Sequence, residues 1–353
     1  MKYSVEKQIE YKSLLMRTRV PHTAYAVARK EIARSYHALG TTSFPQCQQL
    51  LGVSRSGKSM LAMDFLDGYP SRRTEAGNIH EIVYACIPPK GTTKGLLENL
   101  LRALGDPHWD RGAESRKLAS LINLLEGCKC RAIILDEFQH LADKGQKNQN
   151  LQFTINFIKS LVEPNKWLLI ASGLPSANRV IEQDAQLRNR FPNALTLPRF
   201  DWFDHELRGE FMGVLGCFQK ALKVFDLPQL DSEEMTMRFY LATGGLIGLL
   251  TRILQRAVED AVDENRRAIS MKHFSEAFER EVRFAHHYGA NGPFKMKVAE
   301  APMGQCLKEV AHLIESEGVE LPDAQTEVII KTSNKTVTKR QHTTELGLAF
   351  GAS

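Results

Sequence analysis

The sequence predicts an α/β protein in which a five-stranded parallel sheet, with helices on both faces, is followed by a small all-helical lid. Between about residues 46 and 200, short apolar segments alternate with segments whose apolar residues recur every three or four positions. Strands and helices that alternate in this way form a parallel sheet, because each connection crosses over it. From 201 to 288 only helical patterns continue, as in the stripe from Leu250 to Ala261 and in a helix that Ser270 can cap.

The composition is that of an ordinary globular protein, in a chain long enough for two domains. Its 353 residues are 43% hydrophobic and 25% charged. No apolar run approaches the roughly 20 residues of a membrane span, so we expect no membrane association and a cytoplasmic protein. The six cysteines show neither CxxC pairs nor a zinc-site spacing, which predicts reduced thiols. A net charge of +5 is compatible with a polyanionic partner but does not establish one.

A glycine-bearing turn at residues 52–59 fits the pattern G-x-x-x-x-G-K-[ST] at every fixed position. A short apolar strand precedes it and an apolar-faced helix, Met60–Leu66, follows it, so the order strand, loop, helix is the one that a P-loop requires. Lys58 would reach the β- and γ-phosphates of ATP, and the Ser59 hydroxyl would ligate Mg²⁺. The residues predicted to bind the nucleotide are Gly52, Val53, Ser54, Arg55, Ser56, Gly57, Lys58, Ser59 and Met60.

An acidic pair follows the third predicted strand, Arg131–Leu135. Asp136 and Glu137 stand at the carboxyl end of that strand, where open α/β sheets bind their ligands. Asp136 would hold Mg²⁺ through its water shell, and Glu137 would polarise the attacking water as a general base. Together with Lys58, this pair predicts ATP hydrolysis rather than storage of the nucleotide.

Two further polar features lie downstream. Ser172 ends the fourth predicted strand, where its hydroxyl could bind the γ-phosphate or the attacking water, or could serve only the turn. Arg188 and Arg190 precede the fifth predicted strand, at about 194–197. They could neutralise charge on the nucleotide of a neighbouring subunit, or form a solvated or structural pair. His140, beside the acidic pair, is expected to be structural.

The chain divides into four predicted parts. They are an N-terminal arm at 1–45, the nucleotide-binding core at 46–200, the helical lid at 201–288 and a partly disordered tail at 289–353. A helix that begins at Thr23 is expected to pack beside the P-loop strand. Gly68–Arg73 has turn residues and is expected to be a loop, and Lys331–Arg340 is expected to be a solvated tail or an anion-binding one.

This order of parts resembles the AAA+ ATPases and, more narrowly, the TniB/TnsC family of transposon-encoded AAA+ ATPases, over roughly residues 20 to 285. Two departures from the wider pattern are present. Gly248 stands where many AAA+ lids have a sensor arginine, with Arg252 one turn later, and Arg55 is unusual inside a P-loop. The motifs that carry the resemblance are Asp136-Glu137-Phe138-Gln139-His140-Leu141, Gly173-Leu174-Pro175, Arg190-Phe191, Leu197-Pro198 and Thr243-Gly244-Gly245-Leu246-Ile247-Gly248.

The resemblance implies a regulator of transposition that assembles with ATP on double-stranded DNA as a ring or filament. Such regulators connect a target-selecting protein to the transposase, and ATP hydrolysis disassembles them. It also implies that Ser172 is the sensor and that Arg190, or second Arg188, acts in trans. The loop that would contact the DNA backbone without sequence preference contains Lys90, Thr92, Thr93 and Lys94.

Two alternatives have other consequences. A signalling or secretion-linked AAA+ switch would act through protein partners only and would be indifferent to DNA. A P-loop kinase would transfer the γ-phosphate to a small molecule, which the acidic pair, the arginines and the lid disfavour. The sequence identifies neither the partners nor the number of subunits in an assembly.

Overall fold

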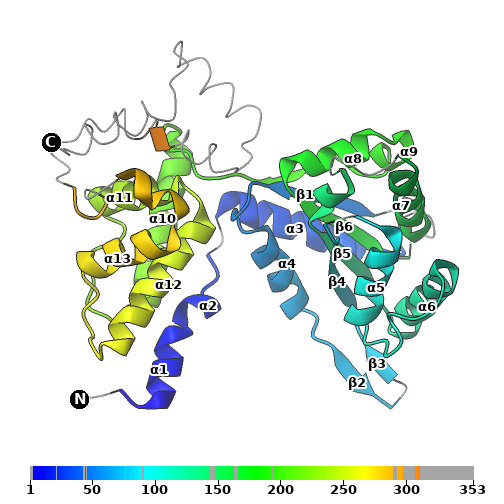
Figure 1. Cartoon of the computed structure of the whole chain (residues 1–353), viewed down its shortest axis with the longest axis horizontal. Helices are drawn as coiled ribbons and strands as arrows, with labels where there is room; N and C mark the ends of the chain where they lie inside the picture. The colour runs from blue at the N-terminus through cyan, green and yellow to red at the C-terminus, as the bar shows by residue number, and fades with distance from the viewer. Residues whose placement is uncertain are drawn as a thin grey trace, which may run out of the picture. The chain divides into compact units, whose positions relative to one another are not determined.

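The computed structural model describes two compact units, a core unit at Ala24–Leu197 and a helical unit made of Met1–Thr23 with Pro198–Ser353 (Figure 1). The described residues are 3–310 except 21, 43, 45, 76, 90, 143–147, 163–165, 193, 289–291, 297–306 and 308. The predicted tail from 311 onward and the predicted DNA-facing residue Lys90 lie outside them.

The core unit is built on a five-stranded sheet in the order β4-β5-β6-β1-β7, and every neighbouring pair of its strands is parallel. This order places the P-loop strand β1 between β6 and β7 and the strand with the acidic pair, β5, beside β6. The register sets Leu50 beside Ser172 and Cys86 beside Asp136. The strands are β1 (Cys47–Gly52), β4 (Ile82–Cys86), β5 (Ala132–Asp136), β6 (Leu168–Gly173) and β7 (Leu195–Leu197).

Helices cover both faces of this sheet, which confirms the predicted fold class. On one face, Tyr25 and Ile32 of α3 pack with Leu61 of α4 against Leu50 and Ile134 of the sheet. Cys47, Leu51 and Ile133 point to the opposite face, because side chains alternate along a strand. The helices of the core unit are α3 (Thr23–Ala38), α4 (Lys58–Asp67), α5 (Thr93–Ala103), α6 (Glu114–Gly127), α7 (Asn148–Val162), α8 (Asn178–Glu182) and α9 (Ala185–Arg188), with the 3₁₀ turns η1 (Phe138–Ala142) and η2 (Pro175–Ala177).

A short antiparallel ribbon lies between α4 and β4, formed by β2 (Arg72–Thr74) and β3 (Gly77–Ile79). The prediction of a loop over Gly68–Arg73 is therefore wrong at its last two residues. Both strands are solvent-exposed, so no apolar alternation marks them. Arg72 is paired with Glu81 at 2.5 Å, and Gly77 supplies the positive φ (126°) beside the turn.

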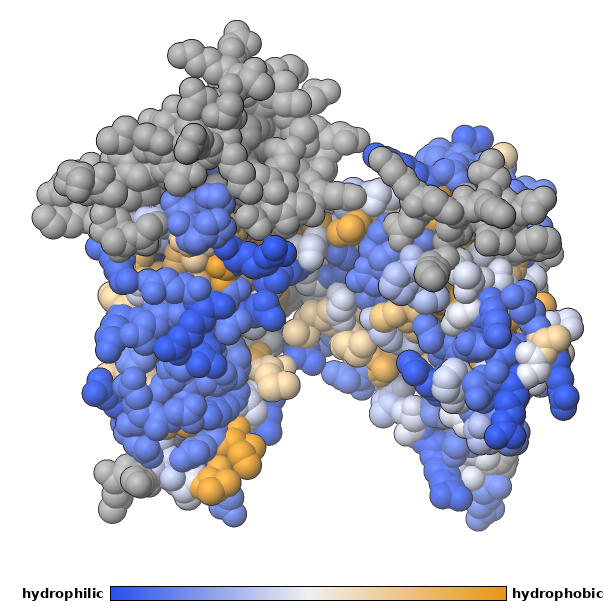
Figure 2. Space-filling view, viewed as in Figure 1, coloured by the Kyte–Doolittle hydropathy of each residue, from blue (hydrophilic) through white to orange (hydrophobic). Residues whose placement is uncertain are grey.

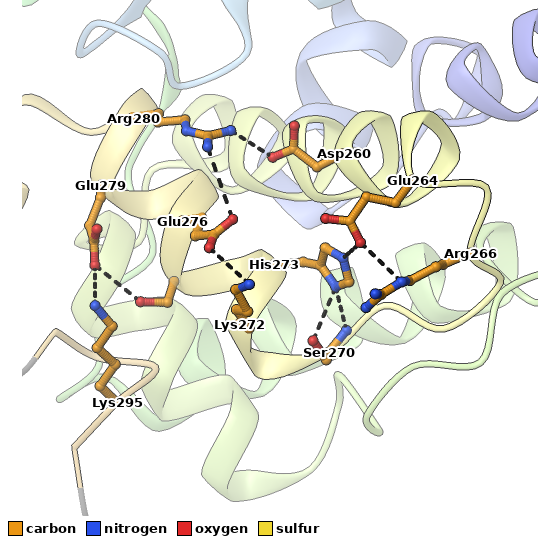
Figure 3. A network of polar contacts seen from close by, with 11 residues as sticks. Asp260, Glu264, Arg266, Ser270, Lys272, His273, Glu276, Glu279, Arg280 and Lys295 are labelled. Atoms are coloured by element: carbon orange, nitrogen blue, oxygen red, sulfur yellow. Dashed lines mark hydrogen bonds and ion pairs between the residues drawn. The ribbon is translucent and has the colours of Figure 1, made fainter.

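The helical unit buries the apolar stripes that the sequence predicts. Leu250, Ile253 and Ala261 of α12 are fully buried, and Ser270 caps α13 in a capping box with His273, as Figure 3 shows. In the same view, Glu264, the residue directly after α12, contacts His273 on α13 at 3.4 Å. The elements of this unit are α1 (Val5–Lys12), α2 (Leu14–Arg17), α10 (His205–Ala221), α11 (Glu233–Thr243), α12 (Ile247–Asp263), α13 (Met271–Glu281) and the 3₁₀ turn η3 (Arg283–Tyr288).

On the face that Figure 2 shows, most of the coloured surface is hydrophilic, and an apolar patch lies over α1. Val5 and Ile9 of α1 are exposed. Among the described helices, none alone has the length and apolarity to cross a membrane. The pair α11 and α12 passes that test together, with a bend of 108° between them.

Candidate nucleotide-binding site

The P-loop lies between the end of β1 and the start of α4. Gly57 has φ 103°, a left-handed conformation that favours glycine, and it stands at the N-cap of α4 without a side-chain cap. The first N–H groups of α4 are therefore available to an anion. Ser56 is buried, and its hydroxyl has no hydrogen-bond partner among the described residues. A buried donor of this kind, in a loop with free N–H groups, fits a phosphate.

Lys58 folds back over its own loop. Its ammonium donates to the carbonyls of Gly52 at 2.8 Å and Val53 at 2.9 Å. Burial lowers the pKa of Lys58, while the negative charges of Asp136 and Glu137 oppose this shift. The ammonium is thus held at the loop, with both carboxylates near enough to act on its charge.

Asp136 accepts hydrogen bonds from side chains of two strands and of the P-loop helix α4, and from the next backbone N–H. Its Oδ2 accepts from the Ser59 hydroxyl at 3.1 Å and from the Tyr84 hydroxyl at 2.7 Å. Its Oδ1 accepts from the Ser172 hydroxyl at 2.8 Å and from the N–H of Glu137 at 3.0 Å. Four donors on a buried carboxyl suit its ionised form, which only accepts. The predicted residues Ser59, Asp136 and Ser172 are therefore brought together.

Glu137 leaves the end of β5 with φ 57°, a left-handed conformation that is uncommon for a glutamate. Its side chain is about half exposed, and the Gln139 amide donates to its Oε2. His140 approaches the same oxygen at 4.0 Å. Glu137 is thus the more accessible carboxylate, and Asp136 is the enclosed one.

Sequence reasoning missed Tyr84 and the role of Gln139. Tyr84 is in the interior of β4, and only the parallel register with β5 brings its hydroxyl to Asp136. Burial, and hydrogen bonds with Cys86 and Asp136, raise the pKa of Tyr84, so it remains a donor at neutral pH. The alternation of side chains in a strand would have placed Tyr84 on one face, but not beside a particular carboxylate.

The two predicted arginines lie near the start of β7. Arg188, the last residue of α9, is exposed and pairs with Glu182 at 3.6 Å. Arg190 is half-buried and close enough to Cys47 that its guanidinium partly offsets the effect of burial, which raises the pKa of that thiol to about 12. Cys47 begins β1, whereas the P-loop follows its end, about 16 Å along the strand.

The predicted DNA-facing loop leads into α5. Thr92 is the N-cap of α5 and accepts from the N–H of Gly95 at 3.2 Å, while the Thr93 hydroxyl contacts that of Thr154 at 3.0 Å. Lys94 is mostly exposed, with its ammonium 4.0 Å from Glu98. Both threonines therefore have roles within the fold, and Lys94 is the side chain that is directed to solvent.

The donor set suits magnesium better than a transition metal. Ser59 and Asp136 offer oxygen ligands side by side, and Mg²⁺ prefers such ligands together with nucleotide phosphates. Among the described residues, no cluster of three or more histidine, cysteine or acidic side chains could hold a metal by itself.

The family model of the bacterial TniB protein matches residues 14–202, more than half of the 353-residue chain. The chain belongs to the TniB family. The match spans the P-loop, the acidic pair, Ser172 and both arginines. Comparison with curated proteins finds no match.

Solved structures of ORC and Cdc6 proteins share the fold of this TniB family member. The Aeropyrum pernix ORC2 protein, in its ADPNP and ADP complexes, is 14% identical with a TM-score of 0.56, over 95% of this chain and 90% of that one. The Aeropyrum pernix ORC1 protein in complex with DNA is 15% identical with a TM-score of 0.52, over 97% of each chain. Cdc6p from Pyrobaculum aerophilum is 13% identical with a TM-score of 0.52, over 91% and 88%. At these identities the likeness shows a shared fold and nothing more.

Proposed function

We propose that this TniB family protein is an ATP-dependent, DNA-binding AAA+ regulator of transposition. It assembles on target duplex DNA, connects a target-selecting protein to the transposase, and disassembles when it hydrolyses ATP. One observation carries the proposal: in a chain of the TniB family, the hydroxyls of Ser59 and Ser172 both donate hydrogen bonds to the Asp136 carboxylate.

The geometry supports binding of ATP with Mg²⁺. The N–H groups at the start of α4 would bind the phosphates, and Lys58 would exchange its two loop carbonyls for phosphate oxygens. Ser59 and Asp136 would hold Mg²⁺, which supplies positive charge to the phosphates. That the Aeropyrum pernix ORC2 structure contains ADPNP and ADP in the same fold supports a nucleotide ligand.

Hydrolysis would depend on the accessible carboxylate. Glu137 would accept a proton from the attacking water, a task that requires a carboxylate within hydrogen-bond reach. Arg190, near the start of β1, would act on the nucleotide of a neighbouring subunit, and Arg188 is the second candidate. This assignment agrees with the position of Arg190 at the end of β1 opposite to the P-loop of its own subunit.

Contact with DNA would be electrostatic and independent of sequence. Lys94, exposed at the start of α5, and Lys90 would contact phosphates, with Thr92 and Thr93 beside them. The Aeropyrum pernix ORC1 structure of the same fold is a complex with DNA, which supports a nucleic-acid partner.

The test is electron microscopy of the purified chain with random-sequence duplex DNA, Mg²⁺ and a non-hydrolysable ATP analogue. We expect regular rings or filaments on DNA with the wild type and none with Lys58→Ala. Lys94→Ala is the second variant, and it should weaken assembly on DNA while leaving ATP binding unchanged. Assemblies of the same kind without DNA would favour a switch that acts through protein partners only.

A further inference from the structure

Two motifs that lie far apart in the sequence meet at one side chain. Gln139 follows the acidic pair, and Leu174 follows β6, the strand that carries Ser172 and ends at Gly173. The Gln139 amide donates to Oε2 of Glu137, and its Oε1 accepts from the N–H of Leu174 at 3.0 Å. Gln139 is buried, so the middle of this bridge is inside the core unit, while its Glu137 end is half exposed.

Hydrogen-bond chemistry fixes the orientation of the Gln139 amide. A backbone N–H can only donate, so the atom that faces Leu174 must be the carbonyl oxygen. The amide nitrogen must then face Glu137, whose ionised carboxylate can only accept. In this orientation each end of the side chain has a complementary partner. If the amide were flipped, its N–H would face the N–H of Leu174, and its oxygen would face the Glu137 carboxylate.

Gly173 leaves the space that the Gln139 carbonyl occupies. A Cβ added at Gly173 would lie 2.5 Å from Oε1 of Gln139, and 3.1 Å from both the Ala177 Cβ and the Phe138 nitrogen. The closest atom is the end of a flexible side chain, so an alanine at 173 would displace Gln139 before it disturbed the backbone. The glycine and the glutamine therefore form one structural unit.

We propose that Gln139 is a positioning residue for Glu137. It links the carboxylate that would activate water to Leu174, two residues after Ser172, and so holds Glu137 in its left-handed conformation at a fixed place beside Asp136. This role rests on the proposed ATPase activity. It also assigns a physical reason to the glutamine of the acidic box and to the glycine of the Gly-Leu-Pro motif.

Steady-state ATP hydrolysis by the full chain, with duplex DNA present, tests the positioning role. Gln139→Leu should lower kcat about tenfold or more, because a displaced catalytic group loses that much or more, while KM and ATP-analogue binding change less than twofold. Gln139→Glu should keep an acceptor for the N–H of Leu174 yet lose kcat, because its second oxygen repels the Glu137 carboxylate. A kcat within twofold of wild type in Gln139→Leu would overturn the proposal.

A double-mutant cycle on thermal unfolding, without nucleotide, tests the contact itself. Gly173→Ala should lower the unfolding midpoint more in the wild-type background than in Gln139→Ala, where the 2.5 Å contact is gone. If Gly173→Ala lowered the unfolding midpoint equally in the wild type and in Gln139→Ala, the positioning role would be overturned. The proposed function would stand, provided that the wild-type protein hydrolyses ATP. A wild-type chain without ATPase activity would instead overturn the proposed function, and the positioning role with it.

Discussion

At the scale of single residues, the site depends on how Asp136 is held. Its two oxygens accept from side chains of α4, β4 and β6, and from the next backbone N–H. Each donor contributes to keeping a charged carboxylate inside the protein, where an unsatisfied charge would be costly. The residues around Asp136 are therefore structural supports of the folded state as well as parts of the site.

Tyr84→Phe removes one of these donors and almost no volume. We expect the free energy of unfolding to fall by about 1.5 kcal/mol, because hydrogen bonds to charged groups contribute roughly that much. The measurement is urea unfolding of the full chain without nucleotide.

Tyr69→Phe is the matched control for that substitution. The Tyr69 ring packs against Tyr36 and Phe65, and its hydroxyl has no hydrogen bond among the described residues. Its loss should change stability by less than about 0.5 kcal/mol. If both phenylalanine variants were equally stable, the Tyr84 hydroxyl would not be supporting Asp136.

The sequence was sufficient to predict the place in the fold of residues whose pattern has a fixed spacing, while their roles in ATP hydrolysis stay predictions. Lys58 and Ser59 follow from one local pattern, and Asp136 follows from an apolar strand that ends in acids. Tyr84 could not be predicted in the same way, because its role depends on the register between β4 and β5, which no local pattern encodes. Gln139 stood within a recognised box, but its bond to Leu174 depends on where β6 ends.

At the scale of elements, β1 must approach both β7 and its own P-loop. Gly52 lies opposite Leu197 in the parallel register. A Cβ at Gly52 would lie 2.4 Å from the Ser56 hydroxyl and 2.5 Å from the Leu197 carbonyl. The second atom is backbone, so β7 would have to move away from β1 to admit a methyl group.

Gly52→Ala should therefore destabilise the protein by about 1 to 3 kcal/mol, the usual cost of overpacking. It should also weaken ATP binding, because Ser56 belongs to the P-loop. Urea unfolding and titration with a fluorescent ATP analogue measure the two effects.

Gly127→Ala provides the comparison. Gly127 is in α6, and an added Cβ would meet nothing within 4 Å. Because Gly127 is the last residue of α6, we expect unchanged ATP binding and a stability gain of less than about 1 kcal/mol. Full stability and full ATP binding in Gly52→Ala would show that β1 and β7 can separate freely.

The elements differ in how well they can be predicted from their sequences. The sheet strands carry apolar runs because both of their faces are covered, and their helices carry stripes of period 3.6. The ribbon β2–β3 has neither, since its residues are almost all exposed and each strand is three residues long. Arg72 of β2 also pairs with Glu81, which follows the ribbon, and composition does not reveal this contact.

At the scale of the whole molecule, two buried thiols make stability depend on pH. Burial raises the pKa of Cys47 and of Cys130 from 9.0 to about 12. The unfolded chain releases these protons above pH 9, whereas the folded chain keeps them. Their contribution is therefore complete below pH 9 and is lost as the pH rises toward 12.

When the pH rises from 8 to 10, the free energy of unfolding should fall by about 1 kcal/mol for each of the two thiols. Urea unfolding at both pH values, for the wild type and for Cys47→Ala with Cys130→Ala, measures this. The double variant is expected to be less stable at pH 8 but to lose less between the two pH values. An identical loss in both proteins would mean that these thiols do not stay protonated in the fold.

An assembly adds a requirement that a single chain cannot meet by itself. We propose that Arg190 completes the site of a neighbouring subunit. An Arg190→Ala subunit then has an intact site of its own but supplies no arginine to its neighbour. A Glu137→Gln subunit supplies the arginine but has no working site. Each variant alone should hydrolyse ATP at under about a tenth of the wild-type rate, because an arginine that acts in trans raises kcat by about 10³ or more.

Mixing the two variants on duplex DNA should restore activity. In an equal mixture, half of the subunits have a working site and half of their neighbours supply the arginine, so we expect about a quarter of the wild-type rate. A mixture of Glu137→Gln with Arg188→Ala, in place of Arg190→Ala, decides between the two arginines.

Arg188 is exposed and paired with Glu182, so Arg188→Ala alone should keep most of the ATPase activity. If the Arg190→Ala mixture stayed inactive while both variants still assembled, Arg190 would act within its own subunit or only in packing beside Cys47.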